Sequence, residues 1–188
     1  MNGPAISPGG RRRWVVLDRD GVINRDSADY IRGLADWHPL PGAMRAIARL
    51  SDAGFGLAVA TNQSGIGRGY LDLPTLEAIH ARLREQVAAA GGQLAAIAWC
   101  PHTPDDHCAC RKPRPGLLTQ LMAECGFAAA DALMIGDAAR DIEAARAAGM
   151  AALAVGAEAP RLGADFGVPT FTDLAHAADW LLEGNWPC

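Results

Sequence analysis

Two aspartates, one residue apart, follow the first strongly apolar run of the chain. Asp18 and Asp20 come directly after residues 14–17 and precede Gly21, so both carboxylates leave a predicted strand in a turn. A carboxylate held against a divalent cation stays ionised and can attack phosphorus, whereas a neighbour shielded from that cation can keep a proton for a leaving oxygen. Asp18 suits the nucleophilic role and Asp20 the acid role. Taken alone, such a pair is more often a structural turn.

Three further polar groups follow later apolar runs, in the order that a phosphoryl-transfer site needs. Thr61 can donate a hydrogen bond to a phosphate oxygen, and Lys112 offers a positive charge for the transferred group. Asp137, after the apolar residues 132–135, is an oxygen ligand of the kind that Mg²⁺ prefers, and Asp141 lies one helical turn later to hold or orient it. Each residue alone also has an ordinary structural interpretation, such as a solvated lysine or a helix N-cap.

Together these side chains place four carboxylates in one predicted crevice. The carboxylates repel one another and would repel a phosphate dianion, so the sequence predicts a bound cation, Mg²⁺. We expect the ion to be held by Asp18, the backbone carbonyl of Asp20 and Asp137. A phosphate oxygen and waters would complete an octahedron.

A cluster of cysteines and histidines lies just before Lys112. Three of the five cysteines fall within eleven residues, which in a cytoplasmic chain indicates metal rather than disulfides. The predicted zinc ligands are Cys100, His102, Cys108 and Cys110. Free thiols are the alternative, and His107 competes with His102. Because Arg111 and Lys112 follow directly, a closed zinc site would stiffen the loop of residues 100–110 and position both cations without taking part in the chemistry.

Short apolar runs alternate with helical patterns along the chain. Strands are predicted at residues 14–17, 55–60, 94–99, 132–135 and 151–155, and helices at residues 43–53, 75–90, 116–125, 139–148 and 173–183. This alternation predicts an α/β fold with a parallel sheet covered by helices. Ligands bind in such folds outside the carboxyl ends of the strands, where the polar clusters fall.

Composition and length exclude several classes of protein. The chain has 188 residues, 50% of them hydrophobic and 20% charged, with a net charge of −4. We therefore expect one domain, residues 1–188, with residues 1–12 flexible, and neither a nucleic-acid-binding face nor a disordered chain. No run approaches the roughly 18 apolar residues of a membrane span. We expect a cytoplasmic monomer that acts on a small soluble substrate and binds no nucleic acid or membrane.

The spacing of the motifs also excludes a cap domain. Only 42 residues separate Asp18 from Thr61, and 50 separate Thr61 from Lys112. Predicted strands and helices already occupy both stretches. Selection of the substrate must then come from loops, chiefly residues 24–38 and the zinc loop.

With these motifs in place, the chain resembles the haloacid dehalogenase-type phosphatases over residues 14–155. The four motifs of that family match Asp18 with Asp20, Thr61, Lys112, and Asp137 with Asp141. The resemblance implies a Rossmann-like three-layer fold and an aspartyl-phosphate formed on Asp18. It also implies that Asp20 acts as acid and then base, that Thr61 and Lys112 stabilise the phosphoryl group, and that Mg²⁺ binds at Asp18, Asp20 and Asp137.

A narrower resemblance rests on the segments DRDGVIN, TNQSGIGRG, CPH and CACRKPRPG. They are similar to the D-glycero-D-manno-heptose 1,7-bisphosphate phosphatases, whose relatives with a similar zinc loop are the histidinol-phosphate phosphatases. The resemblance implies removal of the 7-phosphate from a phosphorylated sugar. Histidinol phosphate is the alternative substrate, and a zinc-stabilised module without catalysis is the alternative of another class.

The same resemblance implies a set of substrate contacts. These are Asn24, Asp26, Tyr30, Asn62, Gln63, Ser64 and Arg111. One position departs from the pattern, because Ala138 stands directly after Asp137 where some relatives carry a lysine. This chain therefore lacks whatever contact that lysine makes.

Overall fold

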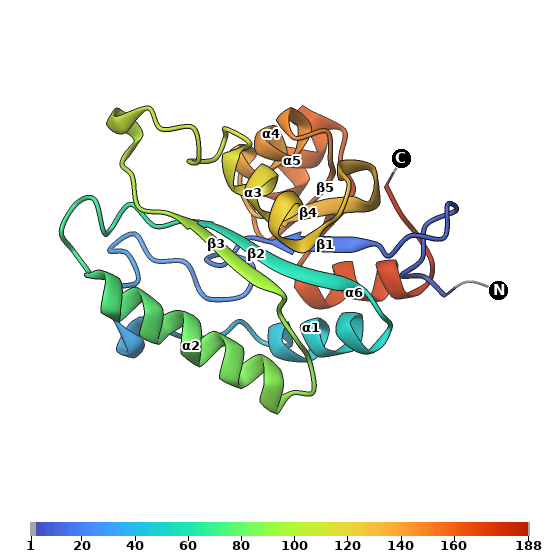
Figure 1. Ribbon diagram of the computed structural model, residues 1–188, viewed down its shortest axis with the longest axis horizontal. Helices are drawn as coiled ribbons and strands as arrows, with labels where there is room; N and C mark the ends of the chain where they lie inside the picture. The colour runs from blue at the N-terminus through green and yellow to red at the C-terminus, as the bar shows by residue number, and fades with distance from the viewer. Residues whose placement is uncertain (1–2, 188) are drawn as a thin grey trace.

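All six strands of the sheet run parallel, in the order β3–β2–β1–β4–β5–β6 (Figure 1). The computed structural model describes residues 3–187. The strands are β1 (Trp14–Leu17), β2 (Gly56–Asn62), β3 (Ala96–Cys100), β4 (Ala132–Gly136), β5 (Ala151–Val155) and β6 (Thr170–Phe171). The strand order reverses at β1, between β2 and β4. A doubly wound sheet binds its ligand beside such a reversal.

Helices cover both faces of the sheet and complete a Rossmann-like three-layer sandwich. The helices are α1 (Ala43–Asp52), α2 (Leu73–Ala89), α3 (Gly116–Cys125), α4 (Ala139–Ala147), α5 (Ala159–Phe166) and α6 (Leu174–Leu182). Three short 3₁₀ helices, η1 (Leu34–Asp36), η2 (Pro104–Asp106) and η3 (Ala129–Asp131), lie in the connections. In Figure 1, α1, α2 and α6 lie below the sheet and α3, α4 and α5 above it.

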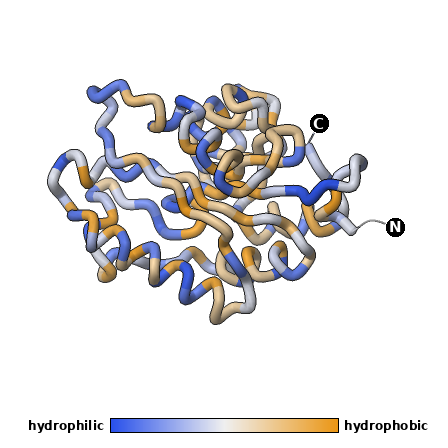
Figure 2. Tube along the Cα trace, viewed as in Figure 1, coloured by the Kyte–Doolittle hydropathy of each residue, from blue (hydrophilic) through white to orange (hydrophobic). Residues whose placement is uncertain are grey.

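The pleat of β1 divides the core into two clusters. Val15 and Leu17 pack with the side chains of α1, α2 and α6, whereas Trp14 and Val16 pack with those of α3, α4 and α5. Successive residues of a strand point to opposite faces, and both faces here are buried, so the strand is apolar throughout. Figure 2 shows the hydrophobic colours concentrated along the inner strands.

The predicted elements are confirmed, with ends that shift by up to two residues. β2 and β3 both extend further toward the site than predicted, to Asn62 and Cys100. Helix α5 and strand β6 were not predicted. The pattern of α5 is masked by Pro160 in its first turn and by Gly163, where a Cβ atom would lie 2.4 Å from Thr170 Cγ2.

The amino-terminal segment, which was predicted to be flexible over residues 1–12, makes defined contacts over residues 3–12. Ala5 is buried in the core, Ile6 pairs with Arg12 in a β-bridge, and the Arg13 backbone nitrogen donates to the Ala5 carbonyl at 2.7 Å. The apolar side chain of Ala5 belongs to the core cluster that contains the α1 and α6 side chains, and its burial anchors the segment. Residues 1 and 2 lie outside the described part.

The connections hold no cap domain within residues 3–187, as predicted. Between β1 and β2 the chain forms loops, η1 and α1, and between β2 and β3 it forms a loop and α2. None of the helices in this described range has the length and apolar character needed to cross a lipid bilayer.

Candidate active site

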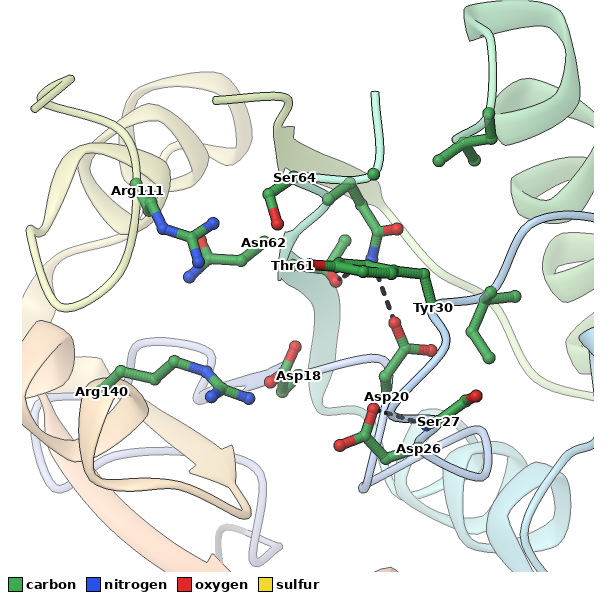
Figure 3. A pocket seen from close by; sticks show the side chains of 14 residues that line it. Asp18, Asp20, Asp26, Ser27, Tyr30, Thr61, Asn62, Ser64, Arg111 and Arg140 are labelled. Atoms are coloured by element: carbon green, nitrogen blue, oxygen red, sulfur yellow. Dashed lines mark hydrogen bonds between the residues drawn. The ribbon is translucent and has the colours of Figure 1, made fainter. Parts of the chain in front are cut away.

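A pocket of about 190 Å³ opens at the carboxyl ends of the central strands (Figure 3). Polar side chains dominate its lining. They are Asp18, Asp20, Asp26, Ser27, Tyr30, Thr61, Asn62, Gln63, Ser64, Arg111 and Arg140. The register of the sheet explains why these groups meet, because Leu17 at the end of β1 pairs with both Val59 of β2 and Ile135 of β4.

Asp18 lies at the buried end of the pocket. Its Oδ1 accepts a hydrogen bond from the Arg19 backbone nitrogen at 2.7 Å and lies 3.0 Å from Lys112 Nζ. Burial raises the pKa of Asp18 to about 7; Lys112 opposes the rise, whereas Asp141 and Asp137 add to it. A cation that pairs with this carboxylate would keep it ionised and nucleophilic at neutral pH.

Lys112 is fully buried between the carboxylates of Asp18 and Asp141. Its Nζ donates to the Ala60 carbonyl at 2.8 Å and lies 2.6 Å from Asp141 Oδ1. Burial alone would lower the pKa of Lys112, but the charges of Asp141 and Asp18 outweigh it and raise the pKa. The ammonium is therefore charged, and strand β2 fixes its place.

Asn62 secures the loop that carries Lys112. Its Oδ1 accepts from the Lys112 backbone nitrogen at 3.1 Å, and its Nδ2 donates to the Lys112 carbonyl at 3.0 Å. Asn62 was predicted to contact the substrate; it lines the pocket, but its side-chain amide is hydrogen-bonded to the Lys112 backbone. The position of Lys112 does not depend on the cysteine loop alone.

Three carboxylates form a cluster suited to a divalent cation. One oxygen each of Asp18, Asp137 and Asp141 lies within 4.8 Å of the others. Together with Lys112 they leave two uncompensated negative charges when ionised. Burial, followed by the charge of Asp141, raises the pKa of Asp137 to about 6. Within residues 3–187, Asp137 Oδ1 is buried without a hydrogen-bond partner, as expected of an oxygen that serves as a metal ligand.

Two glycines give this cluster its room. A Cβ atom on Gly21, whose φ is +84°, would lie 1.9 Å from Asp137 Oδ2, and one on Gly136 would lie 2.2 Å from Asp141 Cβ. The turn after β1 thus presses against the Asp137 carboxylate. The residues present fit Mg²⁺, which favours carboxylate and carbonyl oxygens.

Asp20 is held apart from the three clustered carboxylates. Arg19 donates to both of its oxygens, from Nε to Oδ1 at 3.0 Å and from NH2 to Oδ2 at 2.6 Å. Gln63 Nε2 donates to Oδ2 at 3.1 Å and to Thr61 Oγ1 at 2.8 Å. The Asp20 side chain keeps 19% exposure toward the pocket, so it can reach a bound substrate while staying away from the cation site.

Asn24 does not line the pocket as its predicted role requires. Its side chain is fully buried, with Nδ2 donating to the Arg25 carbonyl at 3.0 Å and Oδ1 accepting from the His38 backbone nitrogen at 2.6 Å. These hydrogen bonds occupy both polar atoms of the side chain and fix the start of the loop of residues 24–38. Asn24 therefore supports the turn that follows Asp20.

The other predicted contacts do lie on the pocket wall. Tyr30 reaches across the pocket opposite Arg111 and Arg140 (Figure 3). Its backbone is left-handed, with φ of 67°, and its ring packs on Tyr70 at 5.1 Å between centroids. Such a conformation is uncommon for a large residue and persists where neighbours hold it. Asp26 and Ser64 complete this rim.

The cysteine loop, residues 100–110, gathers four ligand-type side chains. The Cys110 Sγ lies 3.2 Å from Cys100 Sγ, 3.4 Å from Cys108 Sγ and 3.3 Å from His102 Nδ1. A tetrahedral zinc with Zn–S bonds of about 2.3 Å needs ligand atoms at comparable separations. His107 is exposed and is not a member of the cluster that the described residues form.

The chemistry of this donor set also fits zinc. Although burial opposes ionisation of Cys108, hydrogen bonds with Cys110 and the Arg111 backbone lower its pKa to about 7. The thiolate is the form that binds metal. Arg111 is tied to the same loop, because its NH1 donates to the His102 carbonyl at 3.1 Å.

Two arginines beside the site received no role from the sequence. Arg19, between the motif aspartates in the sequence, is fully buried behind the pocket, and it continues the strand alternation of Val15 and Leu17 toward α2. That alternation was the signal. Arg140 lies one helical turn after Asp137, with its NH2 4.0 Å from Asp137 Oδ1. The signal there was the i,i+3 spacing on a helix that starts at the site.

The fold and the carboxylate site are those of a haloacid dehalogenase-type hydrolase, and residues 109–171 match the family model described as HAD-hydrolase-like. A D-glycero-beta-D-manno-heptose-1,7-bisphosphate 7-phosphatase of Pseudomonas aeruginosa is 51% identical over 92% of this chain and 99% of its own length. The corresponding enzyme of Bordetella bronchiseptica is 42% identical, over 91% and 98% of the two chains.

A solved structure gives the same result. The D,D-heptose 1,7-bisphosphate phosphatase from B. bronchiseptica, complexed with magnesium and phosphate, superposes with a TM-score of 0.87 at 40% identity, over 92% of this chain and 99% of that one. The chain belongs to the D-glycero-D-manno-heptose-1,7-bisphosphate 7-phosphatase family.

Proposed function

We propose that this protein removes the 7-phosphate of D-glycero-β-D-manno-heptose 1,7-bisphosphate through an aspartyl-phosphate on Asp18. The observation that carries the proposal is the division of the carboxylates: Asp18 lies in the cation cluster beside Lys112, and Asp20 is held outside it but still faces the pocket. The names of the relatives support the substrate, and those more than 40% identical carry the β-anomer.

In the first step, an oxygen of Asp18 attacks phosphorus in line with the bond to the sugar O7. The O–P bond to the sugar breaks, and Asp20 gives its proton to the departing oxygen. Lys112 and the Thr61 hydroxyl stabilise the charge that develops on the phosphoryl oxygens. Two observations support these roles: Asp18, Asp20 and Thr61 line one pocket at the ends of β1 and β2, and Lys112 Nζ lies 3.0 Å from Asp18 Oδ1.

In the second step, Asp20 takes a proton from water. The resulting hydroxide attacks the phosphorus of the aspartyl-phosphate, the acyl O–P bond breaks, and Asp18 and inorganic phosphate are released. The Asp20 carboxylate is suited to both steps because hydrogen bonds from Arg19 and Gln63 fix its orientation.

We assign Mg²⁺ to Asp18, Asp137 and the backbone carbonyl of Asp20, with Asp141 holding Lys112. The ion would supply positive charge for the attacked phosphate and keep Asp18 ionised. Zinc would be held by Cys100, His102, Cys108 and Cys110 and would serve structure alone.

The second phosphate of the substrate needs its own cations at the rim. Arg111, from the cysteine loop, and Arg140, from α4, both reach into the pocket (Figure 3). Guanidinium groups bind phosphate with two parallel hydrogen bonds. We assign Arg111 and Arg140 to phosphate binding, and Tyr30, Gln63, Ser64 and Asp26 to the rim around the sugar.

The decisive experiment compares kcat/KM for both anomers of heptose 1,7-bisphosphate, histidinol phosphate and fructose 1,6-bisphosphate in the presence of Mg²⁺. We expect the β-anomer to exceed the others by at least about tenfold. A tenfold preference for histidinol phosphate, about 1.4 kcal/mol at the transition state, would overturn the substrate. No phosphate release from any of these compounds would favour a binding module.

Arg140 offers a test of the rim. We expect Arg140→Ala to raise KM for the bisphosphate about tenfold, because a charged hydrogen bond to phosphate contributes about 1.5–3 kcal/mol. Arg161→Ala is the matched control, since Arg161 is an exposed arginine of α5 paired with Glu158 at 2.8 Å. An unchanged KM in Arg140→Ala would remove Arg140 from the binding site.

A further inference from the structure

One guanidinium is completely buried directly beside the active site. Arg19 has no exposed surface, yet it is charged and lies between the two motif aspartates. It donates hydrogen bonds to three side chains: to both oxygens of Asp20, to Gln63 Oε1 at 2.9 Å and to His80 Nε2 at 3.3 Å. A charge removed from water is tolerated when it is paired and hydrogen-bonded, and four hydrogen bonds satisfy this guanidinium.

The partner from α2 is matched to this guanidinium. His80 is buried with 7% exposure. Burial, and then the charge of Arg19, lowers its pKa to about 3, so the ring is neutral. Because arginine only donates, Nε2 must be the accepting nitrogen of His80. The histidine thus ties the far side of Arg19 to a long helix without competing for the charge of Asp20.

The fork that Arg19 presents to Asp20 has a geometric consequence. Two parallel hydrogen bonds, at 3.0 and 2.6 Å, fix both the position and the plane of the carboxylate. Without them, only the single hydrogen bonds from Gln63 and Asn24 would hold Asp20, and its carboxylate could turn toward the cation site two residues away. A carboxylate bound to that cation could not deliver a proton to the leaving oxygen.

We propose that Arg19 is a positioning residue for the proton-transfer group: held by His80, it keeps Asp20 aimed at the leaving oxygen and out of the metal cluster. This inference rests on the proposed function, since it concerns the acid of that reaction. The role differs from a merely structural one in a measurable way. Only leaving groups that need a proton should respond to the loss of Arg19.

The test exploits two leaving groups. An alkyl phosphate such as a sugar phosphate leaves poorly without a proton, whereas p-nitrophenyl phosphate releases a stable phenolate. We expect Arg19→Met to lower kcat/KM for the sugar phosphate about 100-fold, the usual worth of general acid catalysis, and for p-nitrophenyl phosphate less than about fivefold. Because kcat/KM reports only the steps through the first bond cleavage, later hydrolysis does not obscure the ratio.

Three further variants serve as references for this result. Asp20→Asn should give the same ratio between substrates, and combining it with Arg19→Met should lower the ratio no further. Arg82→Met, which removes a half-exposed arginine from α2, is the control and should leave both substrates unchanged. Equal losses on both substrates in a folded Arg19→Met protein, or no loss on either, would overturn the proposal.

His80 provides a second test should Arg19→Met not fold. His80→Leu leaves one Arg19 donor unpaired, whereas His80→Gln offers an amide oxygen in its place. We expect His80→Leu to lower the sugar-phosphate rate selectively and His80→Gln to recover most of it. Equal ratios in the two variants would contradict the proposal. Wild-type inactivity toward both substrates would instead refute the proposed function, so the two failures are distinguishable.

Discussion

The carboxylate crevice and the cysteine loop are positioned by different means. In the crevice, the sheet sets the spacing of the functional groups: Asp18 follows β1, Lys112 bonds to the Ala60 carbonyl of β2, and Asp137 follows β4. In the cysteine loop, η2 is the only regular element between β3 and α3. The loop is held by contacts among its own ligand-type side chains and by hydrogen bonds that Arg111 and Arg114 donate to its carbonyls.

This difference separates two uses of metal. The crevice is already assembled by hydrogen bonds and ion pairs, so Mg²⁺ adds charge to an existing frame. In the cysteine loop the four ligand-type side chains join the two ends of the segment, so zinc would complete the fold of that segment. Removing a group from the crevice should therefore affect chemistry, and removing one from the loop should affect local structure first.

The largest effect is expected for Asp18→Asn. An amide cannot attack phosphorus, so we expect kcat to fall by about 10⁴ or more, while the fold and the zinc content stay unchanged. Phosphate release, circular dichroism and metal analysis test this. Ordinary turnover in the variant would show that the aspartyl-phosphate is formed elsewhere. Loss of zinc would show that the two regions are coupled.

A smaller effect on rate is expected for Cys108→Ser. We expect zinc to be lost and kcat/KM to fall about 10- to 100-fold, because Arg111 is tied to the loop whereas Lys112 keeps its bonds to β2. Cys125→Ser is the matched control, since Cys125 lies on α3 outside the cluster. Metal analysis together with kinetics decides the outcome. Complete inactivation would mean that the loop also positions Lys112.

The smallest effect concerns stability and pH. The pKa values of Asp18 and Asp137 are raised to about 7 and about 6, above their usual 3.8, so the folded protein binds more protons than the unfolded chain between pH 4 and 7. Without Mg²⁺, the stability that these two carboxyl groups contribute should therefore be present at low pH. It should be lost as the pH rises through the folded-state pKa values of about 6 and about 7. Thermal unfolding at pH 5 and pH 8 tests this.

Mg²⁺ should reverse part of this loss, because the ion favours the ionised carboxylates. We expect Mg²⁺ to raise Tm more at pH 8 than at pH 5. Asp18→Asn should flatten the pH dependence of the metal-free protein. A metal-free protein that becomes more stable from pH 5 to pH 8 would contradict the raised pKa values.

The sequence predicts the sheet and the order of the site well, because both depend on local patterns. Uniformly apolar runs locate the strands, and the residue after each run falls at the same edge of a parallel sheet. What it does not predict depends on side-chain packing across the fold. The anchoring of Ala5, the full burial of Asn24 and the Asn62–Lys112 hydrogen bonds join residues whose loop geometry no local pattern specifies. Helix α5 was missed because its proline and glycine are tolerated only in the folded context.

The pairing register of β1 decides which functional side chain reaches which face of the sheet. Side chains of neighbouring residues leave a strand on opposite faces, which sends Arg19 toward α2 and leaves Asp18 with Lys112. A slip of one residue in the pairing of β1 would exchange these destinations, bringing a guanidinium to the cation site and the nucleophile to His80. Insertions and deletions should therefore be excluded from residues 14–20. The exposed turn at Ala90 and Gly91, which precedes β3 at the opposite edge of the sheet, can vary in length without disturbing catalysis.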